Sequence, residues 1–366
     1  MAAVSNGRRK RLAVIGLRGF PGIQGGVETH CSQLIPRLAG LFDVRVYRRR
    51  PYLNEASRTG VAGIDFVDLP STRIKGLEPV LHTMLSCLHL LLHRVDVVNI
   101  HNIGPGLFAP VLRLGGMKVV LTYHSPNYEH SKWGHVAKAV LRLSEKIALT
   151  FSNRIIFVSP FQRSKYPEKI QLKSQVIVNG IPVRHDTDGS SFLKKHGLRS
   201  GEYVLAVGRL TPEKGFDTLI RAVNENPDVC TLVIAGEADQ GSDYRGILHA
   251  LNTRGKVIFT GFTTGDDLVQ LYRNAALYVL SSYNEGFPMV LLEAMSYRLP
   301  IVATDIPAAH LIPLPESHYC IPGDAGSMSE AISRVAASPG NTDYDLTPYD
   351  WETIARQTSR VYEELF

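Results

Sequence analysis

Short apolar runs alternate along the chain with longer stretches in which apolar residues recur every three or four positions. The short runs are typical of buried strands and the longer stretches of amphipathic helices, so the pattern predicts parallel strands joined by helices. In the first half we expect strands at 11–17, 44–47, 64–69, 95–100, 118–123, 154–158 and 175–178. Helices are expected there at 26–38, 80–93, 105–114 and 135–150.

The alternation continues in the second half, with strands expected at 203–207, 231–235, 257–260, 277–280 and 301–303. Helices are expected at 216–224, 244–251, 266–273, 289–297 and 325–336. The sequence Asn179-Gly180-Ile181-Pro182 predicts a turn or hinge. We therefore predict an α/β protein with two Rossmann-like doubly wound parallel-sheet domains, 1–180 and 181–350, facing across a cleft. The amphipathic segment 351–366 is expected to pack back on the first domain.

Composition narrows the class of protein. The 366 residues are 44% hydrophobic and 20% charged, which suits a soluble α/β chain. Four cysteines are scattered without a C-x-x-C pair, which argues against a zinc site or disulfide framework and favours a cytoplasmic protein. The longest apolar segment, 77–92, is interrupted by polar residues and is too short for a membrane span.

Charge is distributed unevenly between the two halves. Residues 1–180 contain 25 Lys and Arg against 10 Asp and Glu, whereas residues 181–366 contain 15 against 24. A difference of this size indicates two modules with different partners. The basic residues of the first half form clusters at 8–11, 48–50 and 73–75, the last beside the leucine-rich segment 77–92.

The stretch 284–293 combines two acids with the start of a helix. It follows an apolar strand, and its turn contains Gly286, Phe287 and Pro288 before the helix that begins near Met289 and Val290. A helix start presents free N–H groups to an anion. Glu285 and Glu293 flank this point, which suits a ligand with a central phosphate and hydroxyls on both sides. A surface helix with an acid at each end is the alternative, but Glu293 lies within an apolar run and would need partners.

A second loop, 208–215, follows a strand and contains Arg209 and Lys214. Two cations at a strand end can hold a diphosphate and stabilise the charge that develops as it leaves. An exposed basic loop is the simpler interpretation, although this half of the chain is net acidic.

The loop after the first strand contains Gly16, Gly19 and Gly22 and ends in Gly25-Gly26 at a helix start. It lacks the G-x-G-x-x-G spacing of dinucleotide-binding proteins, and arginines stand where NAD ribose requires an acid. The loop is either a phosphate contact or a structural turn. Two histidines, His101 and His124, end predicted strands and are candidates for a cleft-facing site.

These motifs resemble those of the retaining GT-B glycosyltransferases of family 4, with Glu285–Glu293 as E-x7-E and Gly208–Gly215 as G-R-x-x-x-x-K-G. The resemblance implies that Glu293 holds the ribose hydroxyls and Glu285 the transferred sugar. It places the diphosphate on Arg209, Lys214 and the N–H groups near 287–290. It also implies a glycine-loop contact at Gly25 and Gly26, and His124 near the transferred sugar. Segments similar to those that hold the nucleobase in the family are Gly236, Glu237, Gly261 and Phe262.

The resulting hypothesis is a metal-independent hexosyltransferase that uses a nucleoside-diphosphate sugar as co-substrate. We expect a sugar or lipid-linked oligosaccharide acceptor on the first domain near His101, an anionic membrane surface as a further partner and no nucleic acid. The basic clusters of the first half, together with the segment 77–92, are expected to form the surface that rests on the membrane. Bacterial-type polysaccharide, O-antigen or glycolipid assembly is the expected setting. A nucleotide-sugar epimerase and an NAD(P)-dependent oxidoreductase stay as alternatives. The loop 306–310 departs from the family pattern, and two D-x-D triplets, 186–188 and 343–345, lie in predicted linkers rather than at strand ends.

Overall fold

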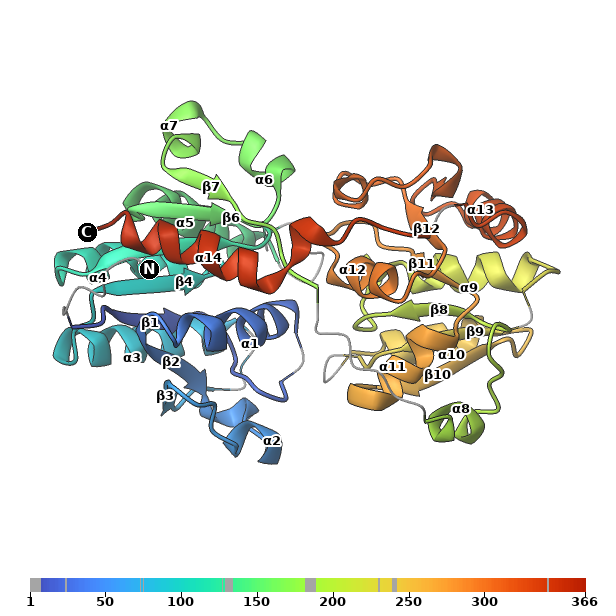
Figure 1. The fold of residues 1–366 in the computed structure, drawn as a ribbon, viewed down its shortest axis with the longest axis horizontal. Coiled ribbons are helices and arrows are strands. Elements are labelled where there is room, and N and C mark those ends of the chain that lie inside the picture. Colours follow the sequence, from blue (N-terminus) through green and yellow to red (C-terminus); the bar gives the residue numbers. More distant parts are fainter. Residues whose placement is uncertain are drawn as a thin grey trace, which may run out of the picture. The chain divides into compact units, whose positions relative to one another are not determined.

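A computed structural model describes residues 8–23, 25–72, 74, 76–126, 128, 134–181, 189–229, 231–238, 242–340 and 342–366. The chain forms two compact units (Figure 1). The N-terminal unit comprises residues 1–180 together with 349–366, and the C-terminal unit comprises residues 181–348. Each contains one parallel sheet, so the predicted fold class is confirmed.

The N-terminal unit contains a seven-stranded sheet in the order β3-β2-β1-β4-β5-β6-β7. The strands are β1 (Arg11–Ile15), β2 (Asp43–Arg49), β3 (Ile64–Leu69), β4 (Val97–His101), β5 (Lys118–Tyr123), β6 (Arg154–Phe157) and β7 (Ser174–Val176). Every pairing is parallel. The first strand ends two residues earlier than predicted, because Gly16 turns the chain at a φ of 98°.

The helices of this unit cover both faces of the sheet. They are α1 (Gly26–Leu38), α2 (Glu55–Arg58), α3 (Leu77–Leu92), α4 (Ala109–Leu114), α5 (His135–Phe151), α6 (Pro160–Ser164), α7 (Glu168–Gln171) and α14 (Trp351–Glu363). The chain places β2 and β3 on one side of β1, and β4 to β7 on the other side. Right-handed crossovers therefore place α3, α4 and α5 together on one face of the sheet. The opposite face is covered by α1 and α14, which pack on each other and pass in front of the sheet in Figure 1.

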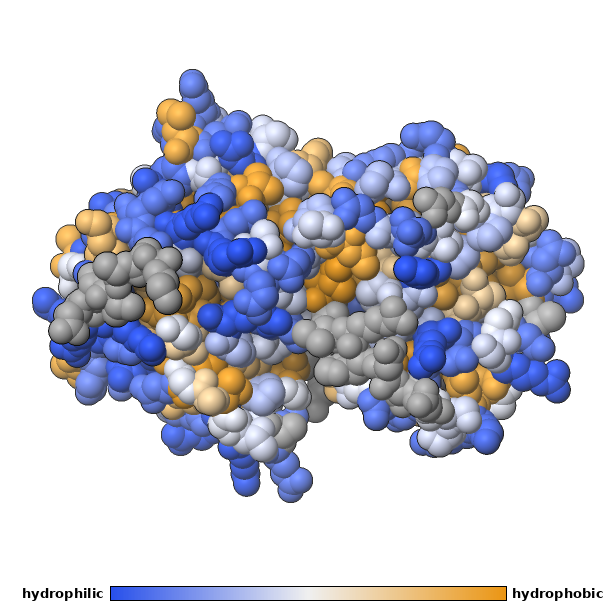
Figure 2. Space-filling view, in the orientation of Figure 1, coloured by the Kyte–Doolittle hydropathy of each residue, from blue (hydrophilic) through white to orange (hydrophobic). Residues whose placement is uncertain are grey.

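The C-terminal helix α14 is part of the N-terminal unit. Its Tyr362 hydroxyl accepts a hydrogen bond of 2.7 Å from Asn99 Nδ2 in β4. The Trp351 ring packs so closely on Gly180 that a Cβ there would lie 2.5 Å from it. The outward residues of α14 are charged, namely Glu352, Arg356, Arg360 and Glu363. Hydrophilic side chains accordingly gather over this helix in Figure 2.

The C-terminal unit contains a six-stranded sheet in the order β10-β9-β8-β11-β12-β13. The strands are β8 (Val204–Val207), β9 (Leu232–Ala235), β10 (Val257–Gly261), β11 (Leu277–Leu280), β12 (Ile301–Thr304) and β13 (Tyr319–Cys320). The helices are α8 (Ser191–Lys195), α9 (Phe216–Glu225), α10 (Tyr244–Leu251), α11 (Gly265–Asn274), α12 (Met289–Ser296) and α13 (Ala325–Ala337). The two-residue β13 was not predicted. Among the described residues, no helix is long and apolar enough to cross a membrane.

Candidate functional site

The candidate residues of the C-terminal unit lie along one edge of its sheet. Since neighbouring strands are parallel, the loops that follow β10, β9, β8 and β11 meet at their carboxyl ends. Phe262 follows β10, Glu237 follows β9, Arg209 follows β8, and Glu285 follows β11. The structure therefore brings the predicted donor-binding residues of four neighbouring strands to the same edge.

Close backbone contacts hold the loop after β8 between its neighbours. Gly236 has a φ of 153°, and a Cβ on it would lie 1.8 Å from the Gly208 carbonyl oxygen. Gly215 has a φ of 63°, and its Cβ would lie 2.1 Å from the carbonyl oxygen of Ser281. Any larger residue at either position would separate the strand ends, so these glycines maintain the spacing of the site.

Lys214 and Glu285 form an ion pair at the centre of this edge. Lys214 Nζ donates to Glu285 Oε1 at 2.6 Å, and the Ser282 hydroxyl donates to the same oxygen at 2.7 Å. Only 19% of the Lys214 side chain and 12% of the Glu285 side chain are exposed, so water screens the pair weakly. A cation and a carboxylate at one point can contact a phosphate and a sugar hydroxyl respectively.

Glu293 lies in α12, the helix that directly follows the turn containing Glu285. Its Oε2 accepts a hydrogen bond of 2.6 Å from the Tyr272 hydroxyl. Burial raises the pKa of Glu293 to about 7, and the hydrogen bond from Tyr272 partly opposes this rise. Tyr272 was not identified from the sequence, because its position on α11 gives no indication of the contact.

The turn before α12 is held by the neighbouring strands. The Thr304 hydroxyl donates to the Ser282 carbonyl at 2.6 Å, and the Tyr283 N–H donates to the Glu213 carbonyl at 2.9 Å. The residues of the helix start are buried or half-buried, namely Gly286, Phe287, Pro288, Met289 and Val290. The first N–H groups of α12 are therefore presented at the same edge as the ion pair.

The two predicted nucleobase segments lie beside each other. The Gly236 N–H donates to the Gly261 carbonyl at 2.8 Å. Glu237 pairs with Arg245 at 3.0 Å, and the ring of Phe262 is 50% exposed. An exposed ring beside two strand ends offers a stacking surface for a planar group.

Three histidines form a cluster at the carboxyl edge of the N-terminal sheet. His101 Nδ1 lies 3.0 Å from His124 Nε2, and the His30 ring lies 5.1 Å from that of His124, centre to centre. His30 Nδ1 lies 2.8 Å from Asn179 Oδ1. Burial lowers the pKa of His30 to about 4, and the hydrogen bond with Asn179 partly opposes this. Burial also lowers the pKa values of His101 and His124 well below the ordinary range, and the neighbouring imidazoles add to the effect at these two. The cluster is therefore neutral at pH 7.

The glycine loop has a buried acid beneath it. Glu28 accepts a hydrogen bond of 3.0 Å from the Arg18 N–H, and a Cβ on Gly25 would lie 2.0 Å from Glu28 Oε2. Gly25 is favoured mainly by its backbone φ of 151°, which other residues rarely adopt, whereas a Cβ on Gly26 would meet no atom within 4 Å. The loop is both a structural turn, at Gly25, and an open helix start, at Gly26. Glu28 and His30 were missed, although they lie two and four positions after the Gly-Gly pair.

The basic cluster 48–50 is not the surface that the sequence predicted. Arg48 is buried and donates to both oxygens of Asp68, at 2.7 and 2.9 Å. Arg49 is also buried and lies 3.3 Å from Glu78. Successive strand residues point to opposite faces, and each face is covered here: Arg48 also donates to the Ser57 carbonyl in α2, and Glu78 belongs to α3. Only Arg50 of the three is exposed. Arg73 and Lys75 of the third cluster lie outside the described residues.

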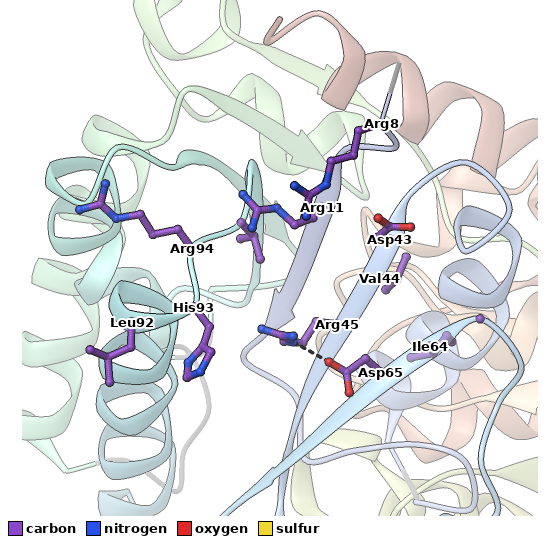
Figure 3. Close-up of a pocket in the computed structure, with 12 residues that line it drawn as sticks. Arg8, Arg11, Asp43, Val44, Arg45, Ile64, Asp65, Leu92, His93 and Arg94 are labelled. Carbon is purple, nitrogen blue, oxygen red and sulfur yellow. Dashed lines mark hydrogen bonds and ion pairs between the residues drawn. The ribbon is translucent and has the colours of Figure 1, made fainter. Parts of the chain in front are cut away.

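A hollow of about 720 Å³ lies at the opposite edge of the N-terminal sheet, where β1, β2 and β3 begin (Figure 3). Arg8, Arg11, Arg45 and Arg94 line it, and Arg45 pairs with Asp65 at 2.7 Å. Because the ligand sites of such sheets lie at the carboxyl edge, this hollow is separate from the candidate site.

One group of described residues has the composition of a metal site. One ring nitrogen from each of His30, His101 and His124 lies within 4.8 Å of the other two. Of the D-x-D triplets, residues 186–188 lie outside the described residues. Asp343 and Asp345 are exposed in the segment after α13, away from the strand ends.

Two doubly wound parallel sheets, each with its candidate residues at the carboxyl edge, define the class of GT-B glycosyltransferases. The family model described as Glycosyltransferase Family 4 matches residues 24–185, and that described as Glycosyl transferases group 1 matches residues 191–352. The chain belongs to the group 1, family 4 glycosyltransferases, which confirms the resemblance and the prediction of a transferase.

Relatives match over different lengths of the chain. An uncharacterised glycosyltransferase of Methanocaldococcus jannaschii is 26% identical over 96% of this chain and 98% of its own. The alpha-galactosylglucosyldiacylglycerol synthase of Streptococcus pneumoniae is 32% identical over 46% of this chain and 44% of its own. The crystal structure of Anabaena HepE in complex with UDP-glucose has a TM-score of 0.78 at 20% identity, covering 97% of this chain and 100% of that one.

Proposed function

We propose that this glycosyltransferase moves a hexosyl group from a nucleoside-diphosphate sugar to a sugar hydroxyl, with retention of configuration and without a metal ion. The observation that supports this most directly is the Lys214–Glu285 pair at the edge where α12 begins. It combines a cation, a carboxylate and helix N–H groups in one place, which matches a sugar diphosphate. The complex of a structural neighbour with UDP-glucose is consistent with this class of donor.

The residues then have distinct roles. Arg209, Lys214 and the N–H groups at the start of α12 hold the diphosphate and stabilise its charge as the sugar departs. Glu285 accepts hydrogen bonds from hydroxyls of the transferred sugar, and Glu293 accepts hydrogen bonds from the ribose hydroxyls. Phe262 and Glu237 contact the nucleobase.

Retention is proposed to proceed by displacement on the front face of the donor. Glu285 is engaged by both Lys214 and Ser282, which makes it a poor nucleophile. In the proposed reaction the acceptor hydroxyl bonds to the sugar carbon as the bond to phosphate breaks, and the departing phosphate oxygen takes the hydroxyl proton. His124, held neutral, would hydrogen bond to the sugar during transfer.

The acceptor is proposed to be a lipid-linked sugar bound by the N-terminal unit, in polysaccharide, O-antigen or glycolipid assembly at the cytoplasmic side of a membrane. The name of the Streptococcus relative denotes a diacylglycerol glycolipid, which agrees with an acceptor of this kind. The excess of Lys and Arg in residues 1–180 agrees with an anionic acceptor.

A panel of nucleotide-sugars tests the proposal. One of them should raise the unfolding temperature, because a ligand at ~100 times its dissociation constant stabilises by about 2.7 kcal/mol. That donor with glycolipid extracts should yield a glycosylated product that keeps the anomeric configuration. Stabilisation by NAD(P)H alone, or an epimerised donor in the absence of acceptor, would replace the proposal with one of the alternatives.

A further inference from the structure

The outward side of α3 is apolar along its whole length. Its most exposed large side chains recur every three to four residues, at Leu77, Val80, Met84, Leu88 and Leu92, with exposed fractions of 41% to 81%. Single exposed apolar residues are ordinary, but a continuous stripe of five is not. Folding of the unit gives no reason for the stripe, because these side chains stay largely in water.

The inward side of α3 is more polar than the outward side. It buries His82, Thr83, Ser86, Cys87 and Leu90, and the Thr83 and Ser86 hydroxyls donate to carbonyls of their own helix. Helices on the surface of soluble domains normally show the reverse arrangement. The opposite face of the same sheet follows that rule, since the exposed residues of α14 are charged.

The neighbouring helices extend this apolar surface. On α5, Val136, Val140 and Leu143 are 80%, 49% and 55% exposed, and on α4 Leu114 is 89% exposed. Since α4 packs against both α3 and α5, the three helices form one face of the unit. We call this surface the α3–α5 face.

The charges on the α3–α5 face have one sign. Arg113, Arg142 and Lys146 are exposed, and Lys138 is half-buried. The three helices contain two carboxylates, Glu78 and Glu145, and both are engaged inside the unit. Glu78 pairs with Arg49 at 3.3 Å. Glu145 accepts from the Tyr123 hydroxyl at 2.6 Å.

The arginine-lined hollow is continuous with this face. It lies where α3 ends, and Leu92, His93 and Arg94 form part of its wall (Figure 3). The recess is lined by four arginines and two aspartates, Asp43 and Asp65, so its balance of charge is positive. An apolar stripe therefore leads to a net cationic recess, which suits acyl chains beside anionic headgroups. Because α3 and α5 each follow a strand, they begin at the carboxyl edge of the sheet, the edge that contains the histidine cluster.

We propose that the α3–α5 face docks on an anionic lipid bilayer. The apolar side chains of α3, α4 and α5 enter the interface, and the basic residues contact lipid phosphates. A protein partner would require matching acids, and a second copy of this chain would bring the same positive charges together. Docking would place the acceptor edge of the N-terminal unit at the membrane surface, where a lipid-linked acceptor is presented.

Sedimentation of the full chain with vesicles tests the proposal. Vesicles containing phosphatidylglycerol should bind the protein, neutral phosphatidylcholine vesicles should bind it at least tenfold more weakly, and salt should release it. Replacing Val80, Met84 and Leu88 by Ser should lower binding at least tenfold. Replacing Lys138, Arg142 and Lys146 by Ser should lower it about tenfold or more, since each basic residue contributes on the order of a fivefold change.

A matched control replaces two exposed apolar residues away from this face, Leu41 after α1 and Phe366 after α14, which are 51% and 56% exposed. It should bind like the wild type, and all variants should unfold at the wild-type temperature. Equal binding to neutral vesicles, binding to neither kind, or unchanged binding by the α3 variant would overturn the proposal. A wild-type dimer that the α3 variant dissociates would assign the face to a second copy instead. Vesicle binding needs no donor, so its failure would leave the transferase proposal standing.

Discussion

The two sheets share one strand order over six strands, but the candidate groups at their carboxyl edges differ in charge. In the C-terminal unit the edge contains the Lys214–Glu285 ion pair, with Arg209 on the same loop as Lys214. In the N-terminal unit the edge contains His30, His101 and His124, whose lowered pKa values keep them neutral. The same scaffold thus provides one ionic site and one uncharged polar site.

This difference corresponds to two kinds of ligand group. A diphosphate gains charge as its sugar departs, so the site that holds it requires fixed cations. An acceptor hydroxyl is neutral, and a neutral imidazole can orient it without binding competing anions. If the comparison is correct, changes at the ionic edge should affect donor chemistry, and changes at the histidine cluster should affect use of the acceptor.

The largest effect is expected at the ionic edge. Replacing Arg209 and Lys214 together by Ala should lower kcat/KM by more than a hundredfold, since one oxyanion donor contributes about 3 kcal/mol. Steady-state kinetics would measure the loss. The control replaces two exposed arginines of the same unit, Arg221 and Arg254, and keeps the change in net charge equal. A similar loss in the control would assign the effect to overall charge.

The next effect separates binding from turnover. Glu285→Gln retains an oxygen that can accept from Lys214 and Ser282 but removes the charge, so nucleotide affinity should stay near the wild-type value. Turnover should fall about a hundredfold, because the transferred sugar loses its ionic partner. Calorimetry with the nucleoside diphosphate and rates with the complete donor distinguish the two, with the exposed Glu225→Gln as control. Near wild-type turnover would refute the role of Glu285.

Much of the fold was predictable because parallel strands are buried on both faces and stand out as apolar runs. The bounds of β3, β5 and α10 agree with the sequence to the residue. The short β13 was missed because two residues give no periodic signal. Orientation was harder to predict: Arg48 and Arg49 belong to a basic run in the sequence, yet both point inward to acids distant along the chain.

Motif residues of the site were predictable, but their partners were not. Glu285 and Lys214 lie 71 positions apart and meet only because β8 and β11 are neighbours. Tyr272 and Ser282 contact the candidates Glu293 and Glu285 through the same kind of long-range or turn geometry, which no local pattern encodes. The contact of Asn179 with His30, which was not a candidate, is of the same kind. The glycine loop left two interpretations open, and only the backbone φ of 151° shows that Gly25 has a structural role.

A smaller effect is expected from Glu293 and pH. With a pKa of about 7, this carboxyl is about one tenth ionised at pH 6 and mostly ionised at pH 8. Donor affinity should therefore rise about tenfold over that range, because the ionised carboxylate accepts hydrogen bonds from the ribose hydroxyls. Calorimetry with a nucleotide-sugar, whose diphosphate does not titrate there, would measure this. Glu293→Gln should bind more weakly at pH 8 and show no such dependence.

The same carboxyl should affect stability in the opposite sense. Its pKa is raised in the folded state above the ordinary 4.5, so the unfolding free energy falls as pH rises from 4.5 to about 7. Glu293→Gln should thus stabilise the unliganded protein by about 1–3 kcal/mol at pH 8 and change little near pH 4. Denaturant titrations at both pH values would check the sign, and destabilisation at pH 8 would contradict the raised pKa.

At the neutral histidine cluster, His124→Ala should leave the donor dissociation constant unchanged and lower the rate with acceptor by about tenfold to a hundredfold. The lowered pKa of His124 means that its protonation should not limit the rate between pH 6 and 8. Parallel donor-binding and acceptor-saturation measurements distinguish the sites, with His249→Ala on α10 as the control. A loss of donor affinity would remove the separation of roles.

The smallest effect is expected from removing metal ions. The three histidines could in principle hold a cation, but His101 Nδ1 and His124 Nε2 already lie 3.0 Å apart as hydrogen-bond partners. A metal would require the lone pairs of both atoms. The charge of the diphosphate can instead be met by Arg209, Lys214 and the start of α12. Treatment with EDTA should therefore leave turnover within about twofold, and His101→Ala should not change the metal content measured by elemental analysis.

If EDTA abolished transfer and Mg²⁺ restored it, the ionic edge would lack a cation that the protein does not supply. Restoration by Zn²⁺, together with loss of bound zinc in His101→Ala, would instead assign a metal to the cluster and end the contrast between the two edges.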